Sequence, residues 1–315
     1  MKHGLLLALP VLLLAQPLAA QQQAASAAAP TPGAIVATAP APDWEPIDPA
    51  DLLVMTLAPD AKGAPRQVVM QLMPAPFSQP WVENIRTLAK TRWWDGTTVY
   101  RVVDNWVAQW GDGEDDKAKA KPLPAGMVSP LAPYETPRVA GTEPAPTRAL
   151  VQSHAHRDSF FDGWPIASGA ESAWPVHCYA SVGVARDLYP DTGTGAELYA
   201  VIGHAPRALD RNIAVVGRVI EGIEHLSTLP RGKGDAGVYD DPALKVPILS
   251  VRLGSELPDP PRFEYLASDS DSFARYVAVR ANRNDSFYRV PAGGVDICNV
   301  QVPIRRVASE GKVGR

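Results

Sequence analysis

Apolar residues along this chain occur mainly in short runs separated by turn-forming residues. The runs at 52–57 and 67–73 flank the sequence Pro-Asp-Ala-Lys-Gly at 59–63, which predicts two strands joined in a hairpin. β-Branched and apolar residues predict further strands at 97–103, 179–185, 198–202, 214–219 and 248–253. Many short strands with few long helices are typical of a closed β-barrel or a β-sandwich.

One segment has helical periodicity instead. Pro80 can open a helix, and Val82, Ile85, Leu88 and Ala89 then fall on one face of it. Residues 222–226 predict one or two further helical turns.

Two segments have neither periodicity. Residues 21–48 are rich in Gln, Ala and Pro, so we expect a disordered leader, with order beginning near Asp51. From about residue 113 to 177 the chain is polar and Pro-rich with isolated aromatic residues. We expect this insertion to carry function and to be disordered in part.

The residues after Pro258 predict a small unit containing strand and helix. Residues 263–266 suggest a strand, and Phe273, Tyr276 and Val277 define the apolar face of a helix that starts near Ser268. Residues 295–304 look extended. Because residues 257–315 are too few for a robust core of their own, we expect this extension to pack on the barrel.

The N-terminus has the three-part pattern of a secretory signal peptide. A basic start is followed by an apolar run at 4–14 and by small residues at 17–20. The apolar run is short for a membrane span, and no cysteine precedes Cys178 to carry a lipid anchor. We therefore expect residues 1–20 to be removed and the protein to be periplasmic, with no membrane span.

Composition narrows the class of protein further. The 315 residues are 46% hydrophobic and carry a formal net charge of −4, which argues against a nucleic-acid partner.

The two cysteines, Cys178 and Cys298, could form a disulfide in an exported protein or remain as two buried thiols, and the sequence leaves both alternatives open.

Five sequence blocks stand out between residues 82 and 219. The first includes the helix at 82–86 and Asp-Gly-Thr at 95–97, and the second is the strand V-Y-R-V-V-D-N-W-V-A-Q-W-G-D at 99–112. The others are S-V-G-V-A-R at 181–186, G-T-G-A-E-L-Y at 193–199, and Leu209-Asp210 followed by V-G-R-V at 216–219. In this order the blocks resemble those of the cyclophilin family of peptidyl-prolyl cis-trans isomerases. The resemblance implies an eight-stranded antiparallel barrel capped by two helices over residues 49–256.

The resemblance also implies a site. Arg101 matches the family's catalytic arginine, and Gln109 matches the glutamine that holds the peptide backbone and orients that arginine. Ala185 matches a residue whose backbone contacts the peptide. The positions that line the proline pocket correspond to Trp106, Val107, Tyr199 and Leu209. No cofactor or metal is implied, and we expect a monomer that acts on proline-containing polypeptides of exported proteins and assists their folding.

The sequence departs from the family pattern at several of these positions. Trp106 and Tyr199 replace phenylalanines, and Val107 replaces a methionine. Glu197 replaces a glutamine, and Ile213 stands where many members have histidine. Trp110 replaces a glycine, and Ala208 stands where many eukaryotic members have a tryptophan. These changes bear on substrate preference more than on reaction type.

Three other functions compete with isomerase activity as explanations of the sequence. A chaperone with the same fold could bind proline-containing segments with little catalysis. A metal site could use His154, His156 and His177, although their loop-like surroundings favour ordinary exposed histidines. A hydrolase lacks support, because no G-x-S-x-G or comparable nucleophile motif occurs.

Overall fold

The computed structural model describes residues 29–114, 116, 118–131, 133–138, 155 and 157–308. The predicted signal peptide, the start of the predicted leader, His154 and His156 lie outside the described residues. Within the described part of the chain, no helix is both long and apolar enough to cross a membrane.

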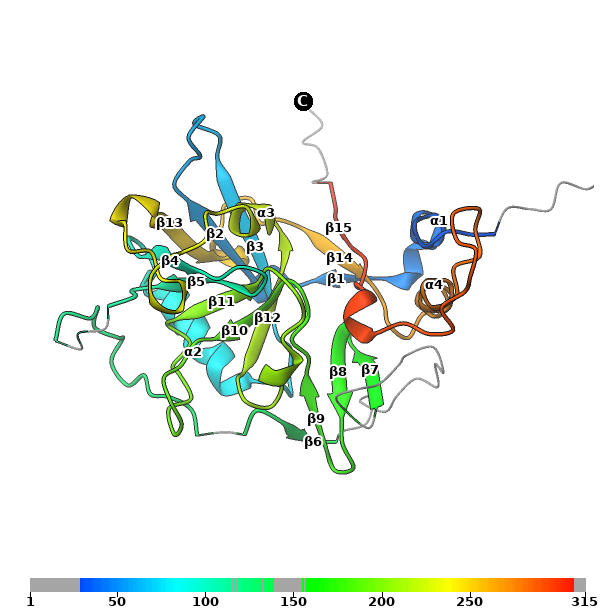
Figure 1. Cartoon of the computed structure of the whole chain (residues 1–315), viewed down its shortest axis with the longest axis horizontal. Coiled ribbons are helices and arrows are strands. Elements are labelled where there is room, and N and C mark those ends of the chain that lie inside the picture. The colour runs from blue at the N-terminus through cyan, green and yellow to red at the C-terminus, as the bar shows by residue number, and fades with distance from the viewer. Residues whose placement is uncertain are drawn as a thin grey trace, which may run out of the picture.

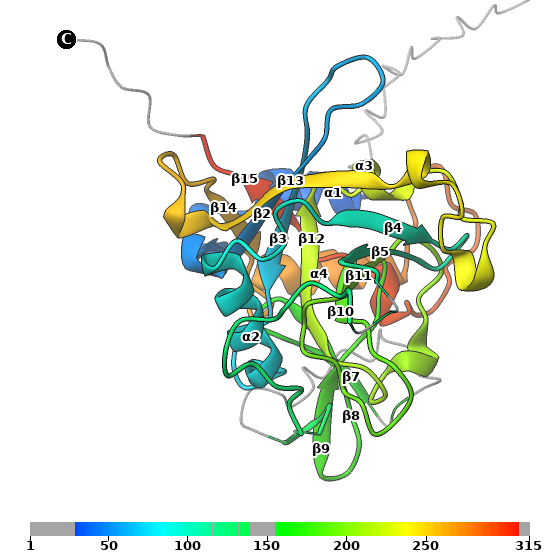
Figure 2. The ribbon, with the colours of Figure 1, turned by 90° about the vertical axis from the view of Figure 1, so that its left-hand side faces the viewer.

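Eight antiparallel strands close into a barrel, as predicted. Around the barrel the order is β10-β11-β5-β4-β13-β2-β3-β12 (Figures 1 and 2). The strands are β2 (Leu52–Leu57), β3 (Arg66–Leu72), β4 (Thr98–Val102), β5 (Val107–Gly111), β10 (Ser181–Val184), β11 (Leu198–Val201), β12 (Val215–Glu221) and β13 (Val246–Leu253).

Helices α2 (Gln79–Lys90) and α3 (Glu224–Ser227) accompany the barrel. The predicted apolar face of α2 is buried in the main core, with Val82, Ile85 and Leu88 fully enclosed. Strands β2 and β3 each contain a nearly continuous run of apolar residues. Such a run is typical of a strand that is covered on both faces. Leu53 faces the barrel core, whereas Leu52 packs outward against the C-terminal unit.

The insertion contains more regular structure than its sequence pattern predicts. Four strands form a second sheet in the order β6-β9-β8-β7. They are β6 (Thr136–Pro137), β7 (Arg157–Phe161), β8 (Trp164–Ser168) and β9 (Ser172–Pro175). The aromatic residues that seemed isolated are anchors of this sheet, since Trp164 packs into the main core and Trp174 into a smaller cluster.

The predicted disordered leader is wrong for residues 32–47. These residues form α1 (Pro32–Thr38) and β1 (Trp44–Ile47), and β1 pairs with β14 (Phe263–Leu266). The leader is ordered because it buries Ile35 and Trp44 against the C-terminal unit, which the local composition does not reveal.

The C-terminal extension packs on the barrel, and the leader completes it. Its sheet has the order β1-β14-β15, with β15 at Ile304–Arg306, and its helix α4 (Asp271–Ala281) lies beside α1. Figure 1 shows α1 and α4 at the end of the molecule opposite the barrel. Phe263 joins the two parts, because it packs with Leu52 and Val54 of the barrel.

The segment predicted to be extended at 295–304 is interrupted by a 3-10 turn at Ile297–Asn299. The Asp296 carboxylate caps the turn by accepting from the backbone N–H of Cys298 at 2.8 Å. Cys298 forms a disulfide with Cys178, the first of the two alternatives that the sequence allows. The bridge ties the C-terminal unit to the end of the insertion.

Candidate active site

Three of the predicted site residues, Arg101, Gln109 and Tyr199, lie in a row across neighbouring strands of the barrel, and Gly183 extends the row to a fourth strand. Arg101 on β4 is paired with Gln109 on β5, and Gln109 is also paired with Tyr199 on β11. Tyr199 is in turn paired with Gly183 on β10. Because cross-strand partners point to the same face of a sheet, this row forms one surface, while the alternating residues fill the barrel core.

The guanidinium of Arg101 is fixed from two sides. Nη1 donates to Oε1 of Gln109 at 2.7 Å, and Nε donates to the carbonyl oxygen of Ala236 at 2.6 Å. Within the described residues, no protein acceptor is recorded for Nη2, so its N–H groups remain available to a substrate. Burial lowers the pKa of Arg101, yet an arginine remains charged at neutral pH.

A series of buried hydrogen bonds on the side away from Arg101 orients the Gln109 side chain. Its Nε2 donates to the hydroxyl of Tyr100, which donates to Oε2 of Glu197 at 2.9 Å. Oε1 of Glu197 accepts from the backbone N–H of Asp112 at 2.8 Å. Because these hydrogen bonds fix Nε2 of Gln109 on Tyr100, the amide oxygen of Gln109 points toward Arg101. Burial raises the pKa of both Glu197 and Tyr100, and the Glu197 carboxylate adds to the rise at Tyr100.

An apolar cluster adjoins the arginine. Its buried members are Val107, Tyr199 and Val201, and the partly buried residues packed against them include Ala185, Leu209 and Ile213. Four residues predicted for substrate contact are thus brought together. Ile213 supplies apolar surface where a histidine is usual in the family.

The other two predicted substrate contacts, Gln109 and Trp106, lie outside this cluster. Trp106 is the more exposed of the two. Its side chain is 37% exposed, and the Arg101 guanidinium carbon lies 5.5 Å from the centroid of its ring. Trp106 therefore covers the arginine rather than forming the floor of the apolar pocket.

Gly183 allows the Tyr199 ring to lie across its strand. A Cβ atom at Gly183 would lie 2.3 Å from the Cζ atom of Tyr199, far inside van der Waals contact. Any larger residue would push the ring out of the cluster.

The prediction of exposed loop histidines is wrong for His177, whose side chain is fully buried. Nδ1 lies 3.0 Å from Oδ1 of Asp210, and Nε2 lies 3.0 Å from the Tyr199 hydroxyl. Because a carboxylate can only accept, the His177 ring donates from Nδ1 to Asp210, which also accepts from the His177 backbone N–H at 2.9 Å. His177 thus supports the pocket wall.

Asp210 links this network to the 3-10 turn at Arg207–Leu209. Its Oδ2 accepts from Nε of Arg207 at 2.6 Å, and Arg207 also faces Asp158 of the insertion sheet at 3.6 Å. The turn carries Leu209 into the apolar cluster. Sequence reasoning gave no role to this network or to Tyr100 and Ala236, because their contacts join segments far apart in the chain.

Comparison with known proteins identifies the family. The family described as cyclophilin type peptidyl-prolyl cis-trans isomerase/CLD matches residues 75–253, more than half of the chain. This chain belongs to that cyclophilin family. Its members catalyse cis–trans isomerisation of prolyl bonds, so the chain is placed among peptidylprolyl isomerases.

Solved structures of cyclophilins resemble the fold. The structure of cyclophilin AquaCyp293 from Hirschia baltica matches with a TM-score of 0.61 at 20% sequence identity, covering 90% of this chain and 100% of that one. The 90% of this chain that is covered is a longer stretch than residues 75–253, so the match includes elements outside the barrel.

A cyclophilin-type isomerase of Cryptosporidium parvum, solved in the presence of the dipeptide Ala-Pro, gives a much weaker likeness. Its TM-score is 0.37 at 10% identity, covering 64% of this chain and 98% of that one. No curated protein matches this chain.

Proposed function

We propose that this cyclophilin isomerises X-Pro bonds of exported polypeptides and that Arg101 is its catalytic residue. One observation carries the assignment: the Arg101 guanidinium is held 2.7 Å from Gln109 beside a buried apolar cluster. The prolyl ring would enter the surface formed by Val107, Tyr199 and Leu209.

The chemistry requires stabilisation of a twisted amide. Rotation about the peptide bond faces a barrier of roughly 18–20 kcal/mol, because the planar amide delocalises its nitrogen lone pair. In the twisted state the prolyl nitrogen becomes pyramidal and regains that lone pair. A cation that donates a hydrogen bond to the nitrogen favours the twisted state over the planar one, which lowers the barrier without a covalent step.

The contacts of Arg101 suit this role. Gln109 and Ala236 fix the guanidinium before the substrate arrives, so little reorganisation is needed during rotation. The adjoining apolar cluster would exclude water around the prolyl ring, which strengthens the interaction between the guanidinium and the nitrogen.

Exported proteins are the proposed substrates. The signal-like N-terminal sequence supports this proposal, and a disulfide suits an oxidising compartment such as the periplasm. Cell fractionation with N-terminal sequencing of the isolated protein tests it. A protein found in the periplasm and starting near residue 21 agrees with the proposal, whereas a cytoplasmic protein with its N-terminus intact contradicts it.

A proline-binding chaperone with weak or no catalysis is the second candidate. The insertion sheet and C-terminal unit favour it, because they add surface beyond the barrel. Exchange rates of short X-Pro peptides, measured over several X residues, separate the two candidates. The isomerase predicts faster exchange than in buffer, whereas the chaperone predicts unchanged exchange together with suppressed aggregation of an unfolded protein.

A further inference from the structure

A cavity lies away from the Arg101 site, between the barrel, the insertion sheet and the C-terminal unit. It has a volume of about 640 Å³ and none of the predicted site residues lines it. Its walls come from the barrel, the insertion sheet, α1 and the C-terminal unit. Cavities of this size hold small organic molecules in other proteins.

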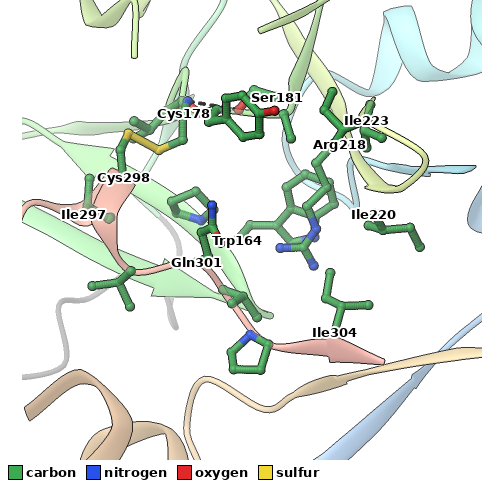
Figure 3. Close-up of a pocket in the computed structure, with 18 of the residues that line it drawn as sticks. Trp164, Cys178, Ser181, Arg218, Ile220, Ile223, Ile297, Cys298, Gln301 and Ile304 are labelled. Atoms are coloured by element: carbon green, nitrogen blue, oxygen red, sulfur yellow. Dashed lines mark hydrogen bonds between the residues drawn. A yellow bond between two sulfur atoms is a disulfide. The ribbon is translucent and has the colours of Figure 1, made fainter. Parts of the chain in front are cut away.

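The walls are largely apolar. Figure 3 shows Ile220, Ile223 and Ile304 on the side of the cavity near Arg218, with the Cys178–Cys298 bridge at the other end. Such a lining binds hydrocarbon surface without directional contacts.

Two arginines, Arg218 of β12 and Arg280 of α4, lie within this apolar lining, and Arg218 is the one held by neutral groups of the barrel and the insertion. Its Nε and Nη2 donate to Oε1 of Gln71 at 3.0 and 2.7 Å, and its Nη1 donates to the carbonyl oxygen of Gly163 at 2.7 Å. The guanidinium carbon stacks 4.2 Å from the ring centroid of Trp164. The guanidinium is therefore held rigidly by neutral groups.

The charge of Arg218 has no anionic partner in the described part of the chain. None of the ion pairs formed there includes Arg218 or the second cavity arginine, Arg280. Desolvation lowers the pKa of Arg218 to about 9, because the partly buried guanidinium loses hydration that no anionic partner replaces. An anion entering the cavity would offset that cost.

The hydrogen bonds of Arg218 leave donors for such an anion. A guanidinium has five N–H groups, and the recorded bonds use one each from Nε, Nη1 and Nη2. One N–H therefore remains on each of Nη1 and Nη2 to donate to an anion.

From this geometry we infer that the cavity is a binding site for a small amphipathic carboxylate, of the fatty-acid class, with its head group on Arg218 and its hydrocarbon body along the isoleucine walls. The site is separate from the proposed isomerase site and does not depend on it. An inorganic anion would leave the apolar walls without a contact, and a neutral hydrocarbon would leave the Arg218 charge unpaired.

Calorimetric titration of the full chain with dodecanoate tests the inference, with acetate and dodecanol as probes that each lack one half of the ligand. We expect dodecanoate to bind about tenfold to hundredfold more tightly than either, since a charge-assisted hydrogen-bonded pair is lost in one case and apolar burial in the other. Equal binding of dodecanol, or no binding of dodecanoate, would overturn the inference.

Variants locate the binding. Arg218→Met should weaken dodecanoate binding by at least about tenfold. Ile304→Trp should weaken dodecanoate binding by a similar factor, because it fills the cavity and leaves the Arg218 charge in place. The inference can therefore still be tested if one of the two variants does not fold. The matched control is Arg305→Met, because Arg305 also stacks on a tryptophan, Trp44, but pairs with Glu264 and does not line the cavity. Unchanged binding in folded Arg218→Met would refute the assignment.

The same head group could come from the end of a polypeptide. An apolar pentapeptide with a free C-terminal carboxylate, compared with its C-terminal amide, tests that source. Weaker binding of the free-acid peptide than of dodecanoate supports the small molecule, and tighter binding of the peptide overturns it.

Discussion

The Nε2 atom of His177 lies 3.0 Å from the hydroxyl oxygen of Tyr199, so a residue at the end of the insertion supports the wall of the proposed proline pocket. The phenolic hydroxyl, which the phenylalanine usual in this family lacks, makes this contact possible. Asp210 fixes the other ring nitrogen and lies next to Leu209, another residue of the pocket cluster. The insertion and the pocket are therefore one packed structure.

Removing the hydroxyl tests this support. Tyr199→Phe should lower the free energy of unfolding by about 1–3 kcal/mol, because Nε2 of the buried His177 loses its partner. Urea unfolding measures the change, and Tyr179→Phe is the control, since Tyr179 is 38% exposed. A loss no larger than that of the control would show that the contact contributes nothing to stability.

Glu197 should make stability depend on pH. Burial raises the pKa of its carboxyl above the ordinary value of 4.5, so above pH 4.5 the folded chain keeps a proton that the unfolded chain has released. Its contribution to the free energy of unfolding is therefore full below pH 4.5 and falls as the pH rises through the raised pKa.

Glu197→Gln removes that contribution. The stability of the variant relative to the parent should increase as the pH rises from 4.5 toward neutrality, as measured by urea unfolding at several pH values. Glu83→Gln serves as the control for loss of a surface carboxylate, since Glu83 is 70% exposed in its side chain. A relative stability that stays constant with pH would contradict the buried carboxylate.

The Cys178–Cys298 bridge should contribute strongly to stability, because it closes a sequence separation of 120 residues. We expect the double variant Cys178→Ser/Cys298→Ser to lose about 2–5 kcal/mol of unfolding free energy. Reductant should lower the melting temperature of the parent and leave that of the double variant unchanged. Equal melting temperatures for oxidised parent and double variant would contradict this contribution.

Much of the barrel could be predicted from local sequence. The run at 52–57, the turn at 59–63 and the periodic face of α2 are local signals, and the structure contains the elements they predict. Arg101 and Gln109 came from the family resemblance, and strand register explains the match: residues eight apart in a hairpin face each other across β4 and β5.

The remaining features depend on contacts between distant segments. Trp44 sits in an Ala- and Pro-rich stretch, and only its pairing with Leu266 makes that stretch a strand. The burial of His177 depends on Tyr199 and Asp210, which lie 22 and 33 residues away. No local pattern encodes such pairings, so they become visible only in the folded chain.

The catalytic role of Arg101 is the central claim, and exchange spectroscopy of an X-Pro peptide tests it most directly. Arg101→Ala should reduce kcat/KM by about 10²–10³-fold, the usual effect of removing a donor that stabilises a transition state. Arg101→Lys should fall between parent and alanine variant, because it keeps the charge without the planar fork of donors. The control is Arg231→Ala, since Arg231 pairs with Asp104 outside the site and should exchange the peptide as the parent does. An Arg101→Ala protein that is folded and within about threefold of the parent in kcat/KM would contradict the account.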